Sequence, residues 1–123
     1  MKIGLFIFLG GGIGSLLRYA TTKYVSGVYE GNFPLATFLI NAIGCLLIGC
    51  FSGFLLKNMP EDTAWKSLLI TGFCGGFTTF SAFSLENITL IAKNENEMML
   101  IYVGLSVVMG FFCTYLGLRI AAL

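Results

Sequence analysis

The residues with the clearest chemical potential form one stretch, TGFCGGFTTF, from Thr71 to Phe80. Three glycines and three threonines in an apolar segment weaken an α-helix there. A break at residues 75–79 would free backbone carbonyls, which bind cations in ion-selectivity filters. The glycines could instead serve only to let neighbouring helices pack closely. Spacing alone leaves both interpretations open.

Hydrogen-bonding side chains without charge recur in the apolar parts of the chain. They are Thr37, Asn41, Ser81, Ser84, Asn87, Tyr102, Ser106 and Thr114. Thr37 and Asn41 are four residues apart and therefore share a helix face. Donors without a fixed charge suit either a small anion or ordinary hydrogen bonding between membrane helices.

Phe80 and Phe83 are three residues apart, on one face of a helix that would follow the break. The edge of an aromatic ring is electropositive and can receive an anion that has lost its water. With 12 phenylalanines in the chain, packing in the core or against lipid is the simpler interpretation of this pair on spacing alone.

Arg18 and Glu86 are the charged residues deepest within apolar runs. A charge at the centre of a membrane helix costs roughly 2.5–3.5 kcal/mol on insertion scales. Each side chain either reaches a wet vestibule or has a structural partner of opposite charge.

The elements that must position these groups are membrane helices. Of the 123 residues, 57% are hydrophobic and only 11% are charged, whereas a soluble domain carries about 25% charged residues. Four apolar runs, each near the length that spans a bilayer, cover residues 3–25, 33–56, 67–92 and 98–121. Short polar connections predict that sequential helices are antiparallel. The sequence thus predicts an all-α membrane protein with four transmembrane helices, as one domain over residues 1–123.

Several other functions are disfavoured. The net charge is +1 with no basic run, so nucleic acid is not an expected partner. The four cysteines fit no metal-binding spacing and are interpreted as small hydrophobic residues. The glycines of residues 10–14 resemble a phosphate loop only superficially, because they lie within a membrane span and lack its lysine. Nothing indicates an enzyme.

Small residues recur at four-residue spacing, which predicts close helix contacts. The positions are Gly10 and Gly14, Gly49 and Gly53, and Ser106, Gly110 and Thr114.

Basic residues are nearly balanced between the two predicted sides of the membrane. Lys2, Lys57, Lys66 and Arg119 oppose Lys23 and Lys93, with Arg18 as a possible third. So weak a bias barely sets orientation, which allows insertion in both directions and antiparallel pairing of two copies.

Three stretches resemble the Fluc (CrcB-type) fluoride channels. The third-span segment from Gly72 to Ser84 resembles the signature of that family, and it is a specific motif. Residues 10–19 resemble the first-helix motif, and residues 37–44 resemble the second-helix motif. The resemblance extends over all four spans.

The resemblance implies a broken third helix and a dual-topology, antiparallel homodimer in the inner (plasma) membrane. It also implies two pores for passive fluoride export and protection from fluoride toxicity. It implies a central sodium ion held by the backbone carbonyls of Gly75 and Thr78. Phe80 and Phe83 would be the pore aromatics, Asn41 a pore donor, and Arg18 part of a vestibule. A polar pore lining would draw on Thr37, Ser81, Ser84, Tyr102, Ser106 and Thr114.

This chain departs from the family pattern at two positions. Ala82 stands where the family usually has threonine, and Ala36 where it commonly has glycine.

Two other functions remain as alternatives, a small multidrug transporter and a membrane assembly subunit that transports nothing. Such transporters carry a glutamate within the first helix, and residues 3–25 contain none.

Overall fold

The computed structural model describes all residues 1–123 and is entirely helical. Four helical segments are long and apolar enough to cross a membrane: Lys2–Val28, Leu35–Asn58, Thr63–Ala92 and Asn96–Ala122. They coincide with the four predicted spans. The first two are helices α1 (Lys2–Val28) and α2 (Leu35–Asn58), and the last is α6 (Asn96–Ala122).

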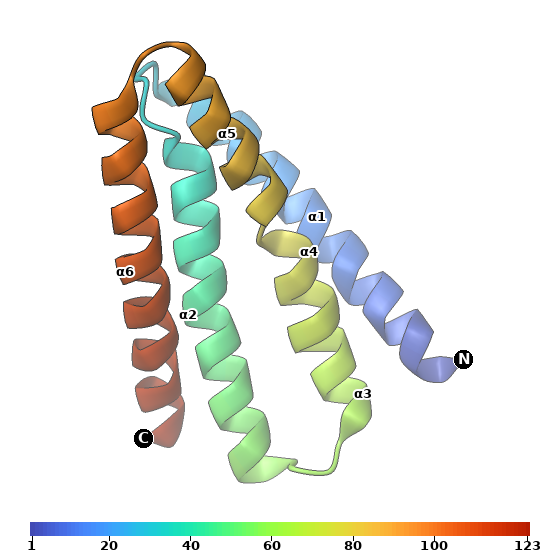
Figure 1. The fold of residues 1–123 in the computed structure, drawn as a ribbon. Coiled ribbons are helices and arrows are strands. Elements are labelled where there is room, and N and C mark those ends of the chain that lie inside the picture. Colours follow the sequence, from blue (N-terminus) through green and yellow to red (C-terminus); the bar gives the residue numbers. More distant parts are fainter.

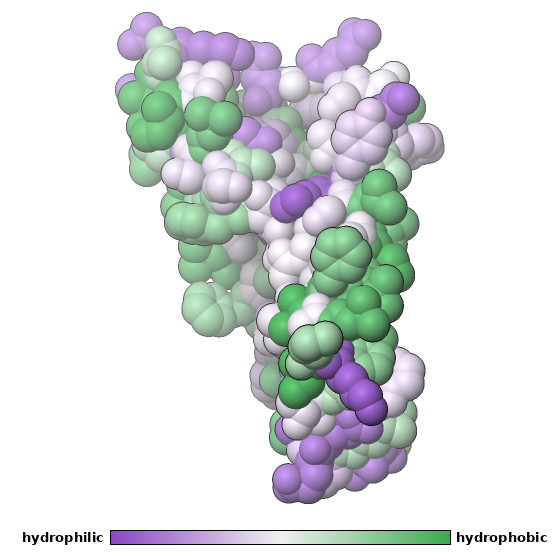
Figure 2. All heavy atoms as spheres, turned by 90° about the vertical axis from the view of Figure 1, so that its right-hand side faces the viewer, coloured by the Kyte–Doolittle hydropathy of each residue, from purple (hydrophilic) through white to green (hydrophobic).

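The surface of the bundle has the polarity of a membrane protein. Only 17 of 123 residues are buried, and large apolar side chains such as Phe8 and Leu100 are 75% and 66% exposed. Figure 2 shows hydrophobic residues over the middle of one face, with hydrophilic residues gathered at both ends. The apolar face matches a bilayer, in which such side chains need no protein cover.

Both chain termini lie at the same end of the bundle as the connection between α2 and the third span (Figure 1). Sequential spans therefore run antiparallel, as predicted. The closest packing joins spans that run in the same direction, because α1 packs along the third span and α2 along α6. The chain thus forms two parallel helix pairs with fewer contacts between them.

Glycines bring the backbone of α1 directly against the third span. A methyl group at Gly14 would collide with the carbonyl of Phe73 and lie 2.8 Å from the nitrogen of Phe77. A methyl group at Gly76 would lie 2.9 Å from the Cα of Gly11. The close contact predicted at Gly10 and Gly14 is therefore confirmed.

A second glycine contact joins α2 to α6. A methyl group at Gly49 would lie 3.1 Å from the Cα of Gly117, and one at Gly117 would lie 2.8 Å from the nitrogen of Cys50. The predicted close contacts are confirmed at Gly49 of α2 and at Thr114 of α6, because a methyl group at Gly49 would collide with the Thr114 carbonyl. Gly117, which lies outside the predicted spacing, also belongs to this contact, whereas a methyl group at Gly110 would meet only the Cys45 sulfur at 3.7 Å.

The third span is built from four short pieces. They are α3 (Thr63–Trp65), the π-helix η1 (Lys66–Cys74), α4 (Gly75–Phe77) and α5 (Phe80–Ala92). The predicted break is present but shorter than residues 75–79, because Gly75–Phe77 are helical. Only Thr78 (φ −75°, ψ 160°) and Thr79 (φ −151°, ψ 120°) are extended.

Different residues of the segment therefore have different structural roles. Gly72 and Gly76 serve the close packing against α1, since a side chain at either would meet its backbone. The two threonines form the break, and Thr79 starts the next helix because its hydroxyl accepts the N–H of Ala82 at 3.2 Å. The helix break and the close helix packing predicted for this stretch are thus both present, each at its own residues.

Candidate functional site

The carbonyls of the break are held by side chains from two other helices. Ser15 and Arg18 of α1 and Asn41 of α2 donate to the carbonyls of Gly76, Thr78 and Thr79 at 3.4, 3.2 and 3.1 Å respectively. Non-helical backbone within a membrane span requires such partners, because no water is present to replace them. The break is therefore held from both neighbouring helices.

Asn41 contacts the break through both ends of its amide. Its Oδ1 accepts the N–H of Thr79 at 2.8 Å, and its Nδ2 donates to the carbonyl of the same residue. An unbroken helix would instead give the Thr79 N–H to the carbonyl of Gly75. That carbonyl has lost its ordinary helical donor.

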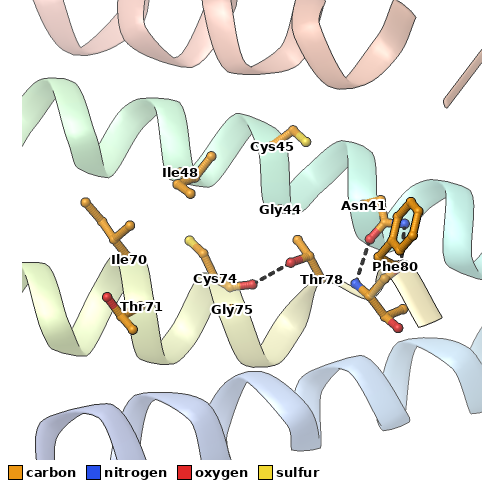
Figure 3. A pocket seen from close by; sticks show the side chains of 11 residues that line it. Asn41, Gly44, Cys45, Ile48, Ile70, Thr71, Cys74, Gly75, Thr78 and Phe80 are labelled. Atoms are coloured by element: carbon orange, nitrogen blue, oxygen red, sulfur yellow. Dashed lines mark hydrogen bonds between the residues drawn. The ribbon is translucent and has the colours of Figure 1, made fainter. Parts of the chain in front are cut away.

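A groove of about 350 Å³ lies between α2 and the broken helix (Figure 3). The predicted site residues Asn41, Gly75, Thr78 and Phe80 all line it. Gly75 is exposed, and the nearest atom to a methyl group there would be the Ile70 carbonyl, 4.0 Å away. Nothing within the chain therefore explains why residue 75 lacks a side chain.

A second cavity of about 470 Å³ lies on the other side of the break and is more polar. Its walls include the predicted site residues Arg18, Thr37 and Ser81, together with Thr79 and Glu86. Arg18 is half-buried, with its guanidinium held by the Thr78 carbonyl. A cavity of this composition can receive a hydrated ion.

Glu86 is bound by hydroxyl groups. Its two carboxylate oxygens accept from Thr37 Oγ1 at 2.6 Å and from the hydroxyl of Tyr102 at 2.7 Å. Thr37 is 5% exposed and Tyr102 is fully buried. These two predicted lining residues therefore act as donors to a carboxylate that joins α2, α5 and α6.

Three aromatic rings follow one another along α5 and α6. The centroids of Phe80 and Phe83 are 5.7 Å apart, and those of Phe83 and Tyr102 are 5.0 Å apart. Phe80 is 78% exposed although it stands at the start of a helix inside the span. A fourth aromatic, Phe33, packs edge-on against Tyr102 at 5.3 Å between ring centroids.

Several predicted pore residues line neither the groove nor the second cavity; besides the buried Tyr102 and its neighbour Phe83, they are Ser84, Ser106 and Thr114. Ser84 is exposed, and Thr114 lies where α6 packs on Gly49. Ser106 is half-buried, and its hydroxyl has no hydrogen-bond partner. These three residues therefore do not share a cavity wall with Asn41 or Phe80.

Two functional candidates were missed as such by the sequence prediction. Thr79 was placed in the break but not in the site, although a threonine just before a helix is a recognisable capping signal. Glu86 was noted as a deep charge without a role. An ionisable residue within a span is the signal that could have assigned it to the site.

The fold and site define a small multi-pass membrane protein organised around a broken helix. Residues 5–118 match the family described as CrcB-like protein, Camphor Resistance (CrcB). A relative in Flavobacterium psychrophilum, named fluoride-specific ion channel FluC, is 50% identical over 98% of both chains. Relatives of the same name in Azobacteroides pseudotrichonymphae and Oceanobacillus iheyensis are 41% and 40% identical over 95% and 98% of this chain, and over 94% and 92% of their own lengths. The chain therefore belongs to the CrcB family.

Proposed function

We propose that this chain is one subunit of a fluoride-selective channel that exports fluoride passively and protects the cell from its toxicity. The observation that carries this proposal is the 50% identity, over 98% of both chains, to a relative named fluoride-specific ion channel FluC. The polar break within an apolar bundle supports it, since it supplies donors at membrane depth. The chain acts as a pore and not as an enzyme, and its place is the plasma membrane.

Fluoride holds its water strongly, so a pore must replace that water with donors. Asn41 uses one N–H on Thr79 and retains a second, since an amide nitrogen carries two. The ring edges of Phe80 and Phe83 provide electropositive surfaces without a fixed charge. The Arg18 guanidinium in the wall of the second cavity attracts the anion before it is desolvated.

The functional unit is an antiparallel homodimer with subunits inserted in both orientations. The balanced basic residues support this, as does the exposed groove that contains Gly75 and Phe80. A second copy against the groove would cover the 78% exposed ring of Phe80. The missing side chain at Gly75 leaves room for such a close approach.

A sodium ion is the expected structural cofactor at the dimer centre. The residues fit a hard monovalent cation, because the Gly75 carbonyl has lost its helical donor and no cluster of His, Cys, Asp or Glu suited to a metal is present. The carbonyl of Thr78 accepts from Arg18 but has a second lone pair. When bound, the cation would supply positive charge that fixes the carbonyls of Gly75 and Thr78 from both copies.

Fluoride efflux from liposomes tests the function. Vesicles that contain the purified protein should release fluoride and retain chloride, whereas empty vesicles should retain both. Release of organic cations driven by a proton gradient would support the multidrug transporter, and no flux of any kind would support the assembly subunit. Either result would overturn the proposed function.

A further inference from the structure

The pairing of Asn41 with Thr79 is the most complete side-chain contact of the break. The Asn41 amide meets the N–H and the carbonyl of one residue at 2.8 and 3.1 Å (Figure 3). Exchanging the two ends of the amide would set oxygen against oxygen and nitrogen against nitrogen, so the contact also fixes its orientation. Each partner thereby holds the other in one geometry.

The contact determines where three hydrogen-bonding groups point. The Thr79 N–H is kept away from the Gly75 carbonyl, and so the helix cannot close across the break. The second N–H of Asn41 remains unused on a side chain that lines the groove. A single residue of α2 therefore controls both a free carbonyl and a free donor.

We propose that Asn41 is the positioning residue of the broken helix and couples the cation site to the pore. This inference rests on the proposed function, because the cation and the anion are assigned there. The Asn41 acceptor holds the break open and so exposes the Gly75 carbonyl. The Thr79 carbonyl in turn orients the Asn41 amide with one N–H toward the ion.

Two substitutions at this position separate the two roles. Asn41→Asp in its protonated form still accepts from the Thr79 N–H and donates to the Thr79 carbonyl, but has no second N–H. Asn41→Leu has similar size and removes both contacts. Asn87→Leu is the matched control, because the Asn87 amide donates to Phe83 within its own helix and does not contact the break.

The closing experiment measures backbone conformation and flux in the full-length dimer. The 13C NMR chemical shifts of Thr78 and Thr79 should report extended backbone in wild type, Asn41→Asp and Asn87→Leu. In Asn41→Leu these signals should move to helical values or broaden. Fluoride flux should fall about tenfold or more in Asn41→Asp, equal to roughly 1.4 kcal/mol, and stay unchanged in Asn87→Leu. The Gly75 carbonyl shift should respond to sodium in wild type and Asn41→Asp but not in Asn41→Leu.

Each arm has an outcome that overturns part of the inference. Extended shifts in Asn41→Leu would show that the break does not need Asn41. Wild-type flux in Asn41→Asp would remove the donor role. If the chemical shift of the wild-type Gly75 carbonyl does not change with sodium, the cation assignment and its coupling to Asn41 fail. The chemical shifts of Thr78 and Thr79 would still decide whether Asn41 holds the break. If Asn41→Leu does not fold, Asn41→Asp still decides the inference, since loss of its extended shifts would overturn it.

Discussion

The hydroxyl of Tyr102 donates a 2.7 Å hydrogen bond to the carboxylate of Glu86, while its ring packs 5.0 Å from that of Phe83. One buried side chain thus joins the aromatic residues of the proposed pore to the carboxylate in the cavity wall. The other oxygen of that carboxylate accepts a hydrogen bond from the hydroxyl of Thr37. The position of Phe83 therefore depends on polar contacts as well as on packing.

Tyr102→Phe should separate these two contributions. The ring contacts to Phe83 and Phe33 remain, but Glu86 loses one of its two donors. A buried group that loses its partner costs about 1–3 kcal/mol, so the unfolding transition of the protein should move to lower temperature. Adding Glu86→Gln should cost less in this background than in wild type. Fully additive effects in this double-mutant cycle would contradict the contact.

Phe80→Ile and Phe83→Ile should reduce fluoride flux while the dimer survives. The substitution removes the electropositive ring edge and keeps most of the apolar volume, and such swaps usually cost under about 1.5 kcal/mol. Flux from liposomes and the dimer fraction are measured on the same samples. If flux is normal in both variants and in the double mutant, these rings are packing residues only.

Phe8→Ile is the matched control for Phe80. Phe8 is 75% exposed and Phe80 is 78% exposed, so the two substitutions remove similar surfaces. Phe8 lies in the first half of α1 and contacts neither the groove nor the second cavity. Equal loss of flux in both variants would point to a general effect of the substitution on the membrane fold.

The four spans could be predicted from the sequence, because each one is a continuous apolar run. The exact break could not, because it depends on a contact between Asn41 and Thr79, which are 38 residues apart. The hydrogen-bond partners of Glu86 could not be predicted either, since Thr37 is 49 residues away from it in the sequence. Helical periodicity places a side chain on a face, but does not say which helix covers that face.

The glycine positions show the same limit. The spacing correctly marked Gly10, Gly14 and Gly49 as close contacts. On α6 it marked Ser106, Gly110 and Thr114, but the contact with Gly49 is at Thr114 and Gly117, and Gly117 was not marked. The relative shift of two packed helices along their axes decides which glycine is at the crossing, and no local pattern encodes that shift.

The proposed insertion in both orientations predicts that C-terminal tags label both sides of the membrane in about equal numbers, in keeping with the weak bias of the basic residues. Engineered cross-links along the groove should join subunits that run in opposite directions. A tag found entirely on one side would contradict dual topology. Adding two lysines at one end should shift the distribution and lower activity, since partners of opposite orientation become rare.

Gly14→Ala should destabilise the protomer because the new methyl group meets backbone and not a movable side chain. It would collide with the Phe73 carbonyl and lie 2.8 Å from the Phe77 nitrogen. Overpacking of this kind typically costs about 1–3 kcal/mol, and here it would separate α1 from the helix that carries the break. Gly12→Ala is the control, since nothing lies within 4 Å of its new methyl group and alanine favours a helix by roughly 0.5–1 kcal/mol over glycine. Thermal unfolding should therefore occur at lower temperature in Gly14→Ala and at an equal or higher temperature in Gly12→Ala. If both variants unfold at the wild-type temperature, the glycine contact between α1 and the third span is not what holds these two helices together.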